Sequence, residues 1–137
     1  MIYIVEMDFR NPEREADWHV WYLGHIAKLI RNVPGFRASQ RFRAITPTPS
    51  PWLAMHDVAS GEVFESAEYR ANGGPVSTKE WRAEHQNWSR NLFSGMDNTP
   101  EVPQTLTCLS SRVTPRCQLR TMRPSPGCRV SASIAVL

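Results

Sequence analysis

A long amphipathic segment, residues 12–32, is the feature that most constrains how this chain folds. Its apolar residues recur with a helical period, Asn11 offers a side-chain cap, and Pro12 suits the first helical position. The sequence "VPG" at residues 33–35 ends the pattern, because Pro and Gly both interrupt a helix. The segment therefore predicts one long helix, which needs an apolar surface to pack against.

Strand-like segments on both sides of this helix supply that surface. Residues 1–9 are rich in β-branched and aromatic side chains, and residues 36–45 alternate between apolar and polar ones. Residues 51–59 read as a third strand after a Pro-rich link. The start of the chain thus predicts a strand, a helix and two further strands.

Two more helices and a last strand are predicted downstream. Residues 60–72 form a short helix that Ser60 caps, and Ser77 with Glu80 has the spacing of a capping box that begins another helix. Residues 90–96 are compatible with a final short strand. The order β-α-β-β-α-(α)-β predicts an α+β domain of the split βαβ, ferredoxin-like plan with an antiparallel sheet. Because helices cover only one face of such a sheet, we expect a homodimer that stacks two sheets.

The chain changes composition after residue 98, which divides it into a domain, residues 1–98, and a tail, residues 99–137. The tail is rich in Ser, Thr, Pro and Arg, has no aromatic residue, and is predicted to be poorly ordered. Its five arginines against one acid account for the net charge of +3, because the domain holds 11 Lys and Arg against 12 Asp and Glu. We expect the tail to be an extension without activity. A basic arm that touches RNA or a membrane is the alternative.

All three cysteines, Cys108, Cys117 and Cys128, lie in the tail. Their odd number and the lack of C-x-x-C spacing predict neither a disulfide framework nor a zinc knuckle. No apolar run approaches the ~20 residues of a membrane span, and acids stand where a signal peptide needs basic residues. We therefore expect a soluble, cytoplasmic protein.

The sequence lacks the motifs of several function classes. It has no Gly-rich phosphate loop, no G-x-S-x-G elbow and no recognisable pair of catalytic carboxylates. Its four histidines, at positions 19, 25, 56 and 85, do not have the spacing of metal ligands, and the domain is too near neutral for a nucleic-acid surface. We therefore expect no metal, no other cofactor and no nucleic-acid or membrane partner.

One face of the first helix carries the first candidate site residues. At ~100° per residue, Trp18, Tyr22, His25 and Leu29 share a stripe that faces the sheet, whereas His19 points to the surface or rim. A histidine at the centre of such a stripe is either a core residue bonded to backbone or a proton-transfer group. Both interpretations of His25 stay open.

A second group lies in the segment predicted as the last helix. Trp81, His85, Trp88 and Leu92 follow the i, i+4, i+7, i+11 rule, which places His85 on an apolar face. Tyr69, at the end of the preceding helix, could meet His85. The tryptophans are also explained as core residues.

The predicted second and third strands contribute further candidates. Arg41 and Arg43 share one face with Ser39, and a guanidinium there suits a carboxylate or enolate oxygen. Alternating arginines are equally typical of a solvated sheet face or a dimer rim. His56 lies on the third strand together with Trp52.

The first strand and the following "DWHVWYLGHIAKLIRNVPGFRASQRF" resemble the dimeric α+β barrel superfamily, which includes EthD-like proteins, muconolactone isomerases, antibiotic-biosynthesis monooxygenases and polyketide cyclases. Many members carry a W/Y-x-x-H-type helix followed by "PG" and a strand. The resemblance covers residues 1–98 and implies a pocket between sheet and helices, with His, Tyr or Arg projecting into it. Polyketide cyclases use a Tyr and His pair for proton transfer, a role that Tyr69 and His85 would take here. The segment "NGGPVSTKEWRAEHQNW" is longer than the family's usual second helix.

The function predicted from these features is cofactor-independent acid–base catalysis, as an isomerase, lyase or cyclase, on a small cyclic, aromatic or keto-acid metabolite. We expect His25 or His85 to take the proton and Tyr69 or Tyr22 to donate to the developing enolate. Arg41 would hold a carboxylate. The predicted substrate-binding residues are Trp18, Tyr22, Arg41, His56, Trp81 and Trp88. The alternatives are a non-catalytic EthD-like binding or accessory protein, and a cofactor-free or haem-associated monooxygenase.

Overall fold

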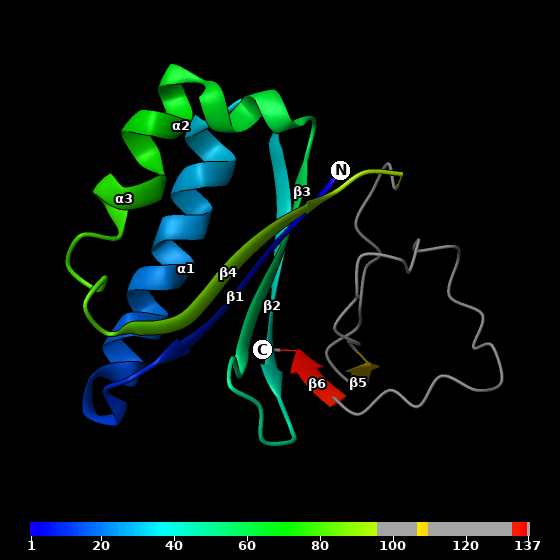
Figure 1. The fold of residues 1–137 in the computed structure, drawn as a ribbon. Helices are drawn as coiled ribbons and strands as arrows, with labels where there is room; N and C mark the ends of the chain where they lie inside the picture. The colour runs from blue at the N-terminus through cyan, green and yellow to red at the C-terminus, as the bar shows by residue number, and fades with distance from the viewer. Residues whose placement is uncertain (96–106, 110–132, 137) are drawn as a thin grey trace, which may run out of the picture.

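The computed structural model describes residues 1–95, 107–109 and 133–136, and its helices lie on one face of a single sheet (Figure 1). The α+β class with an antiparallel sheet, predicted from the sequence, is confirmed. The elements follow in the order β1 (Ile2–Phe9), η1 (Pro12–Arg14), α1 (Glu15–Asn32), β2 (Phe36–Ala44), β3 (Trp52–Val58), η2 (Gly61–Glu65), α2 (Ala67–Asn72), α3 (Gly74–Ser77), β4 (His85–Phe93), β5 (Thr107–Leu109) and β6 (Ser133–Val136).

The sheet has the strand order β4-β1-β3-β2-β6-β5, and each pairing is antiparallel. Strand β1 lies between β3 and β4, so that Val5 has Ala54 on one side and Arg90 on the other. Strands β5 and β6, which belong to the tail, extend the sheet from β2. Most of the tail, including Cys117 and Cys128, lies outside the described residues.

Helix α1 has the limits that its local sequence predicts. The Asn11 side chain accepts a hydrogen bond from the Glu13 amide at 3.2 Å, and a 3-10 turn then leads into the helix. After the helix, the Phe36 amide bonds the Val33 carbonyl at 3.0 Å across Pro34 and Gly35. Gly35 has φ +89, a conformation that side-chain-bearing residues rarely adopt. This turn directs the chain from α1 straight into β2.

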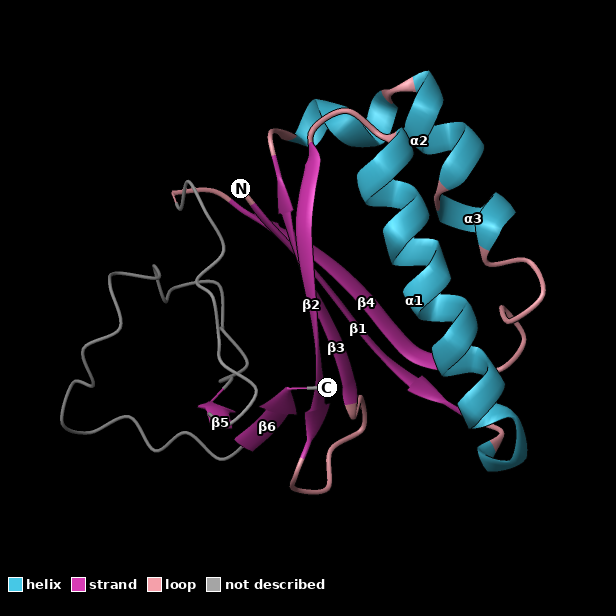
Figure 2. Cartoon of the chain, turned by 180° about the vertical axis from the view of Figure 1, so that it is seen from behind, coloured by secondary structure: helices cyan, strands magenta, loops and turns pink. Residues whose placement is uncertain are grey.

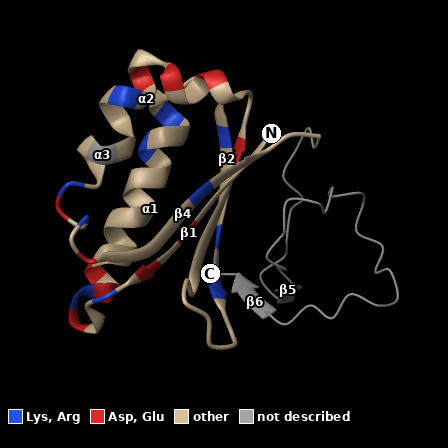
Figure 3. Cartoon of the chain, in the orientation of Figure 1, with Lys and Arg blue, Asp and Glu red and all other residues tan. Residues whose placement is uncertain are grey.

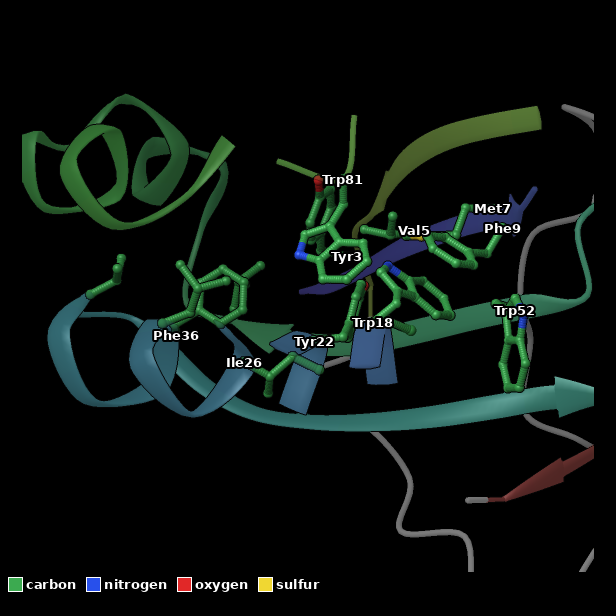
Figure 4. Close-up of a cluster of buried hydrophobic side chains, with 14 of the residues drawn as sticks. Tyr3, Val5, Met7, Phe9, Trp18, Tyr22, Ile26, Phe36, Trp52 and Trp81 are labelled. Atoms are coloured by element: carbon green, nitrogen blue, oxygen red, sulfur yellow. The ribbon is translucent and has the colours of Figure 1, made fainter. Parts of the chain in front are cut away.

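The main core fills the space between α1 and the sheet (Figure 4). Its centre is Trp18, which is fully buried and stacks on Phe9 of β1 with ring centroids 4.6 Å apart. Burial of such a side chain typically contributes ~1.5–3 kcal/mol. A smaller cluster on the opposite sheet face contains Phe42 and Leu53, with Ile4 and Met55 packed against it. None of the described helices is long and apolar enough to span a membrane.

Two predictions about the segment after β3 are wrong. Residues 61–65 form a 3-10 turn, and the cap of the following helix α2 is Ser66, whose side chain accepts from the Tyr69 amide at 3.1 Å, rather than Ser60. The helix predicted to begin at Ser77 is not formed: residues 74–77 make the single turn α3, residues 78–84 turn back, and residues 85–93 form β4.

Strand β4 forms because β1 needs a partner on this side. The backbone of β4 pairs with that of β1, from Phe93 opposite Ile2 to His85 opposite Phe9. Figure 2 shows the two strands side by side, seen from behind. This ladder satisfies the backbone hydrogen-bonding groups with which the two strands face each other, and such tertiary pairing overrides local helical spacing. Asn87, with φ 47, and a register shift between Glu6 and Asp8 interrupt the alternation of side chains.

Candidate functional site

A cavity of about 220 Å³ lies between α1 and the sheet. Its apolar wall includes Val5, Met7, Leu29 and Phe36. Its polar wall consists mainly of three imidazoles and three phenols, those of His25, His56, His85, Tyr3, Tyr22 and Tyr69. Arg82 and Arg90 also line it, and no Asp or Glu occurs among the described residues of its wall. The cavity therefore combines an aromatic interior with proton-transfer groups and a positive charge balance.

Most residues predicted from the sequence as site residues meet in this one cavity. Six of them line it: Tyr22, His25, His56, Tyr69, His85 and Trp88. Trp18, Arg41 and Trp81 are not in the wall and pack around it. Trp81 is buried against Phe9, and Arg14 lies 4.3 Å from the centre of its ring.

His25 lies at the edge of the buried face of α1 rather than at its centre. The buried residues of the helix are Trp18, Tyr22, Ile26 and Leu29, so α1 is rotated toward Ile26 relative to the predicted stripe. His25 is half-buried and stacks in parallel on Trp21 with centroids 5.3 Å apart. Burial, and then the nearby Lys28, lower the pKa of His25 to about 4. The imidazole is therefore neutral near pH 7 and can accept a proton.

His56 is the most deeply buried of the three imidazoles. It is 3 % exposed and lies 5.5 Å from the Tyr3 ring and 5.2 Å from the Phe36 ring, measured between centroids. Burial first, then His25 and Arg41, lower its pKa to about 3. Its Nδ1 atom is buried and has no hydrogen-bond partner among the described residues.

His85 is fixed by a side chain from α1. The indole Nε1 of Trp18 donates to His85 Nε2 at 2.9 Å. Because an indole N–H only donates, the neutral imidazole carries its own proton on Nδ1. Burial lowers the pKa of His85, and Glu84 opposes this shift. His85 therefore presents a hydrogen-bond donor, since the lone pair of its other nitrogen is already occupied.

Two tyrosines of the cavity, Tyr3 and Tyr22, are held in the protonated form. Burial raises the pKa of Tyr22 to about 12, with Arg41 opposing the rise. Burial and then Tyr69 raise the pKa of Tyr3, and Arg90 opposes that rise. Protonated phenols are donors near pH 7, so these groups can bond a carbonyl or enolate oxygen.

Arg41 faces the helix side of the sheet and is 7 % exposed. Its Nη1 lies 3.1 Å from Nδ1 of His19, and its guanidinium lies 4.1 Å from the centre of the Tyr22 ring. Glu15 lies 3.5 Å from the other ring nitrogen of His19, Nε2. His19 is a rim residue, as expected, because its side chain is 28 % exposed; it lies between Glu15 and Arg41 and packs against Trp52.

Three titratable residues of the wall, Tyr3, Arg82 and Arg90, were not predicted as site residues. Tyr3, Val5 and Met7 are alternate residues of β1, so all three side chains lie on the core face. This period of two indicates burial, but it does not distinguish a functional tyrosine from a core residue. Arg82 and Arg90 had no usable signal, because the segment that contains them was predicted as a helix.

The described residues contain no group of three His, Cys, Asp or Glu side chains that could hold a metal ion. The chain matches no protein-family model, and no characterised protein or solved structure shows a significant similarity to it. We therefore infer its function from the residues of the cavity.

Proposed function

We propose that the cavity performs cofactor-independent acid–base catalysis, as an isomerase, lyase or cyclase, on a small cyclic, aromatic or keto-acid metabolite. The observation that carries this proposal is the meeting of three imidazoles, each with a lowered pKa, and three phenols in one apolar enclosure. Neutral imidazoles accept protons and phenols donate hydrogen bonds, which are the two requirements for shifting a proton next to a carbonyl.

The volume of the cavity supports a ligand of about one ring. An apolar cavity of ~150 Å³ holds benzene, and this cavity measures about 220 Å³. A single ring with one or two polar substituents matches that volume. The aromatic side chains of Phe36 and Trp88 offer it faces to stack on.

The roles of the residues follow from their protonation. His25 takes a proton from the carbon next to a carbonyl; the electron pair of that C–H bond forms a C=C bond, and the π pair of the carbonyl moves to its oxygen. The Nδ1–H of His85 and the hydroxyl of Tyr69 donate to this oxygen, and the protonated His25 then returns the proton to another carbon of the ligand. His85 is thus a donor in this scheme, because Trp18 occupies its Nε2.

The arrangement of the strands supports the ferredoxin-like plan and the dimeric α+β barrel superfamily as the fold of this domain. The central strand order β4-β1-β3-β2, with α1 between β1 and β2, is the order of a split βαβ unit. The apolar side chains Ile4 and Met55 on the helix-free face support a homodimer in which a second sheet packs there.

A second candidate function is ligand binding without turnover. The low pKa values of His25 and His56 favour it, because general bases are most effective when their pKa lies near the working pH. In that case the same aromatic enclosure would bind a metabolite and release it unchanged.

The two functions are separated by the fate of a bound ligand. The small molecule that copurifies with the full-length protein is identified by mass spectrometry, and an authentic sample is then incubated with fresh protein. The catalytic proposal expects an isomer, an elimination product or a cyclised product, and a slower reaction with His25→Ala. Recovery of the ligand unchanged after many protein equivalents would overturn catalysis and leave binding as the function.

A further inference from the structure

Three buried polar atoms on the helix-covered face of the sheet have no hydrogen-bond partner among the described residues. They are Ser39 Oγ, Arg41 Nη2 and His56 Nδ1. Ser39 is paired directly with His56 between β2 and β3, so both side chains point to the same face at ~4.5–5.5 Å between Cβ atoms. Arg41 follows two residues later on β2 and shares that face.

The charge of Arg41 is the most unusual part of this group. Within the described part of the chain, the ion pairs of the other arginines involve Arg14 and Arg37, and no carboxylate pairs with Arg41. Its guanidinium contacts His19 and lies over the rings of Tyr22 and Trp18 at 4.1 and 4.9 Å. A buried guanidinium is normally paired with an anion, because burying an unpaired charge is costly.

This group adjoins the cavity. His56 and Tyr22 line the cavity wall, and the Arg41 guanidinium lies over the Tyr22 ring, 4.1 Å from its centre. Arg41 also helps to lower the pKa of His56, so its charge acts on the cavity side of the sheet. Figure 3 shows basic residues at intervals along β2. No Asp or Glu occurs among the described residues that line the cavity.

We propose that Ser39, Arg41 and His56 form a subsite for the carboxylate of a small ligand, so that the substrates of the cavity are anionic. The Ser39 hydroxyl and Arg41 Nη2 donate to the carboxylate, and His56 donates in the tautomer that carries its proton on Nδ1. The inference rests on the proposed function for the choice of ligand, but it concerns binding and does not require turnover.

The test uses the full-length protein with sodium benzoate as the probe and benzamide as its neutral counterpart. Titration calorimetry measures the affinity for each compound. We expect benzoate to bind about tenfold or more tightly than benzamide, and Arg41→Gln to weaken benzoate by about tenfold or more while benzamide is unaffected. Arg43→Gln is the matched control, because Arg43 lies on the same strand face but is exposed.

Three results would overturn the subsite: no benzoate binding at millimolar concentration, equal affinity for benzoate and benzamide, or unchanged benzoate affinity in Arg41→Gln. Loss of benzoate binding in Arg82→Gln or Arg90→Gln, with Arg41→Gln unchanged, would move the anion to the arginines of the cavity wall. If Arg41→Gln does not fold, as judged by far-UV circular dichroism, Ser39→Ala replaces it. A severalfold loss of benzoate affinity then supports the subsite, and an unchanged affinity contradicts it.

The outcomes separate this inference from the proposed function. Tight benzoate binding in a protein that transforms no ligand would leave the subsite intact and overturn catalysis. Turnover of a neutral ketone in a protein that does not bind benzoate would support catalysis and overturn the subsite.

Discussion

The indole nitrogen of Trp18 lies 2.9 Å from Nε2 of His85 and donates a hydrogen bond to it. Trp18 is fully buried, whereas His85 lines the cavity. The bond therefore connects the centre of the core to the candidate site and decides which nitrogen of His85 carries the proton. In the proposed mechanism, Trp18 is a positioning residue that acts through His85.

Replacing Trp18 by Phe tests this relationship. The variant removes the donor, so we expect His85 to populate both neutral tautomers. We also expect its pKa to rise, because the lost bond stabilised the neutral ring. A ¹⁵N NMR titration of the histidine side chains measures both quantities.

Trp21→Phe is the control for that experiment. Trp21 is also near His85, with ring centroids 6.4 Å apart, but the described hydrogen bond to His85 comes from Trp18. An unchanged tautomer and pKa of His85 in Trp18→Phe would show that the bond does not set its protonation.

The buried His56 predicts that the fold loses stability in acid. Its pKa is about 3 in the folded protein and ~6.5 in the unfolded chain, so between these values the unfolded state binds more protons. The contribution of His56 is therefore fully present above pH ~6.5 and declines as the pH falls toward 3. Between pH 7 and pH 5 the expected loss is about 2 kcal/mol in the free energy of unfolding.

The variant His56→Phe isolates this contribution, because it keeps an aromatic ring without a titratable group. Urea unfolding at pH 7 and pH 5 gives the free energy for both proteins. We expect the acid-induced loss to be smaller in His56→Phe by about 2 kcal/mol, with the other histidines contributing equally to both proteins. Equal losses would mean that His56 is protonated in the folded protein at pH 5.

Alanine is expected to have opposite effects at Gly24, within α1, and at Gly35, in the turn that follows it. A Cβ on Gly35 would meet Val63 Cγ2 at 2.7 Å and Ala59 Cβ at 3.2 Å, and its φ of +89 is unfavourable for alanine. We expect Gly35→Ala to lower the free energy of unfolding by ~1–3 kcal/mol. Gly24→Ala should raise it by up to ~1 kcal/mol, because Gly24 lies within α1 with nothing within 4 Å of its Cβ position.

Denaturant unfolding of the two glycine variants measures this difference. The cavity residues are unchanged in both variants, so an unchanged affinity for benzoate serves as the check that the fold is kept. A Gly35→Ala variant as stable as the Gly24→Ala variant would contradict the described turn.

The sequence predicts the first half of the domain well, because its signals are local. Asn11 caps the start of α1, Gly35 ends the turn after it, and the strands on both sides have the expected limits. Capping, turn conformation and side-chain period each depend on residues close together in the chain. His25 and His56 line the same cavity because α1, which carries His25, packs on the sheet that contains β3 and His56.

The second half fails for a physical reason. Trp81, His85, Trp88 and Leu92 have helical spacing, but the backbone of β1 requires a partner and pairs with residues 85–93. A requirement that arises from a strand more than 75 residues earlier in the chain is not encoded in local periodicity.

The position of His19 shows the same limit at the level of a single side chain. Its angle on the helix wheel correctly indicates the rim, where the side chain is 28 % exposed, but it does not show that β2 brings Arg41 to within 3.1 Å of the ring. Alternation along β2 places Arg41 on one of two sheet faces, but it does not say which face the helices cover. The sequence alone therefore does not predict that Arg41 is buried.

The most direct test of the proposed function is deuterium incorporation into an enolisable ligand. Phenylpyruvate, an aromatic keto acid, is incubated with the full-length protein in D₂O, and exchange at the carbon next to the carbonyl is followed by NMR against a protein-free sample. We predict faster exchange with the wild-type protein, a loss of ~10²–10⁴-fold in the protein-dependent rate with His25→Ala, and the wild-type rate with Val20→Ala. Val20 is a suitable control because it lies on the exposed side of the same helix. Binding of phenylpyruvate without exchange, or exchange at the wild-type rate with His25→Ala, would contradict proton transfer by His25 in this cavity.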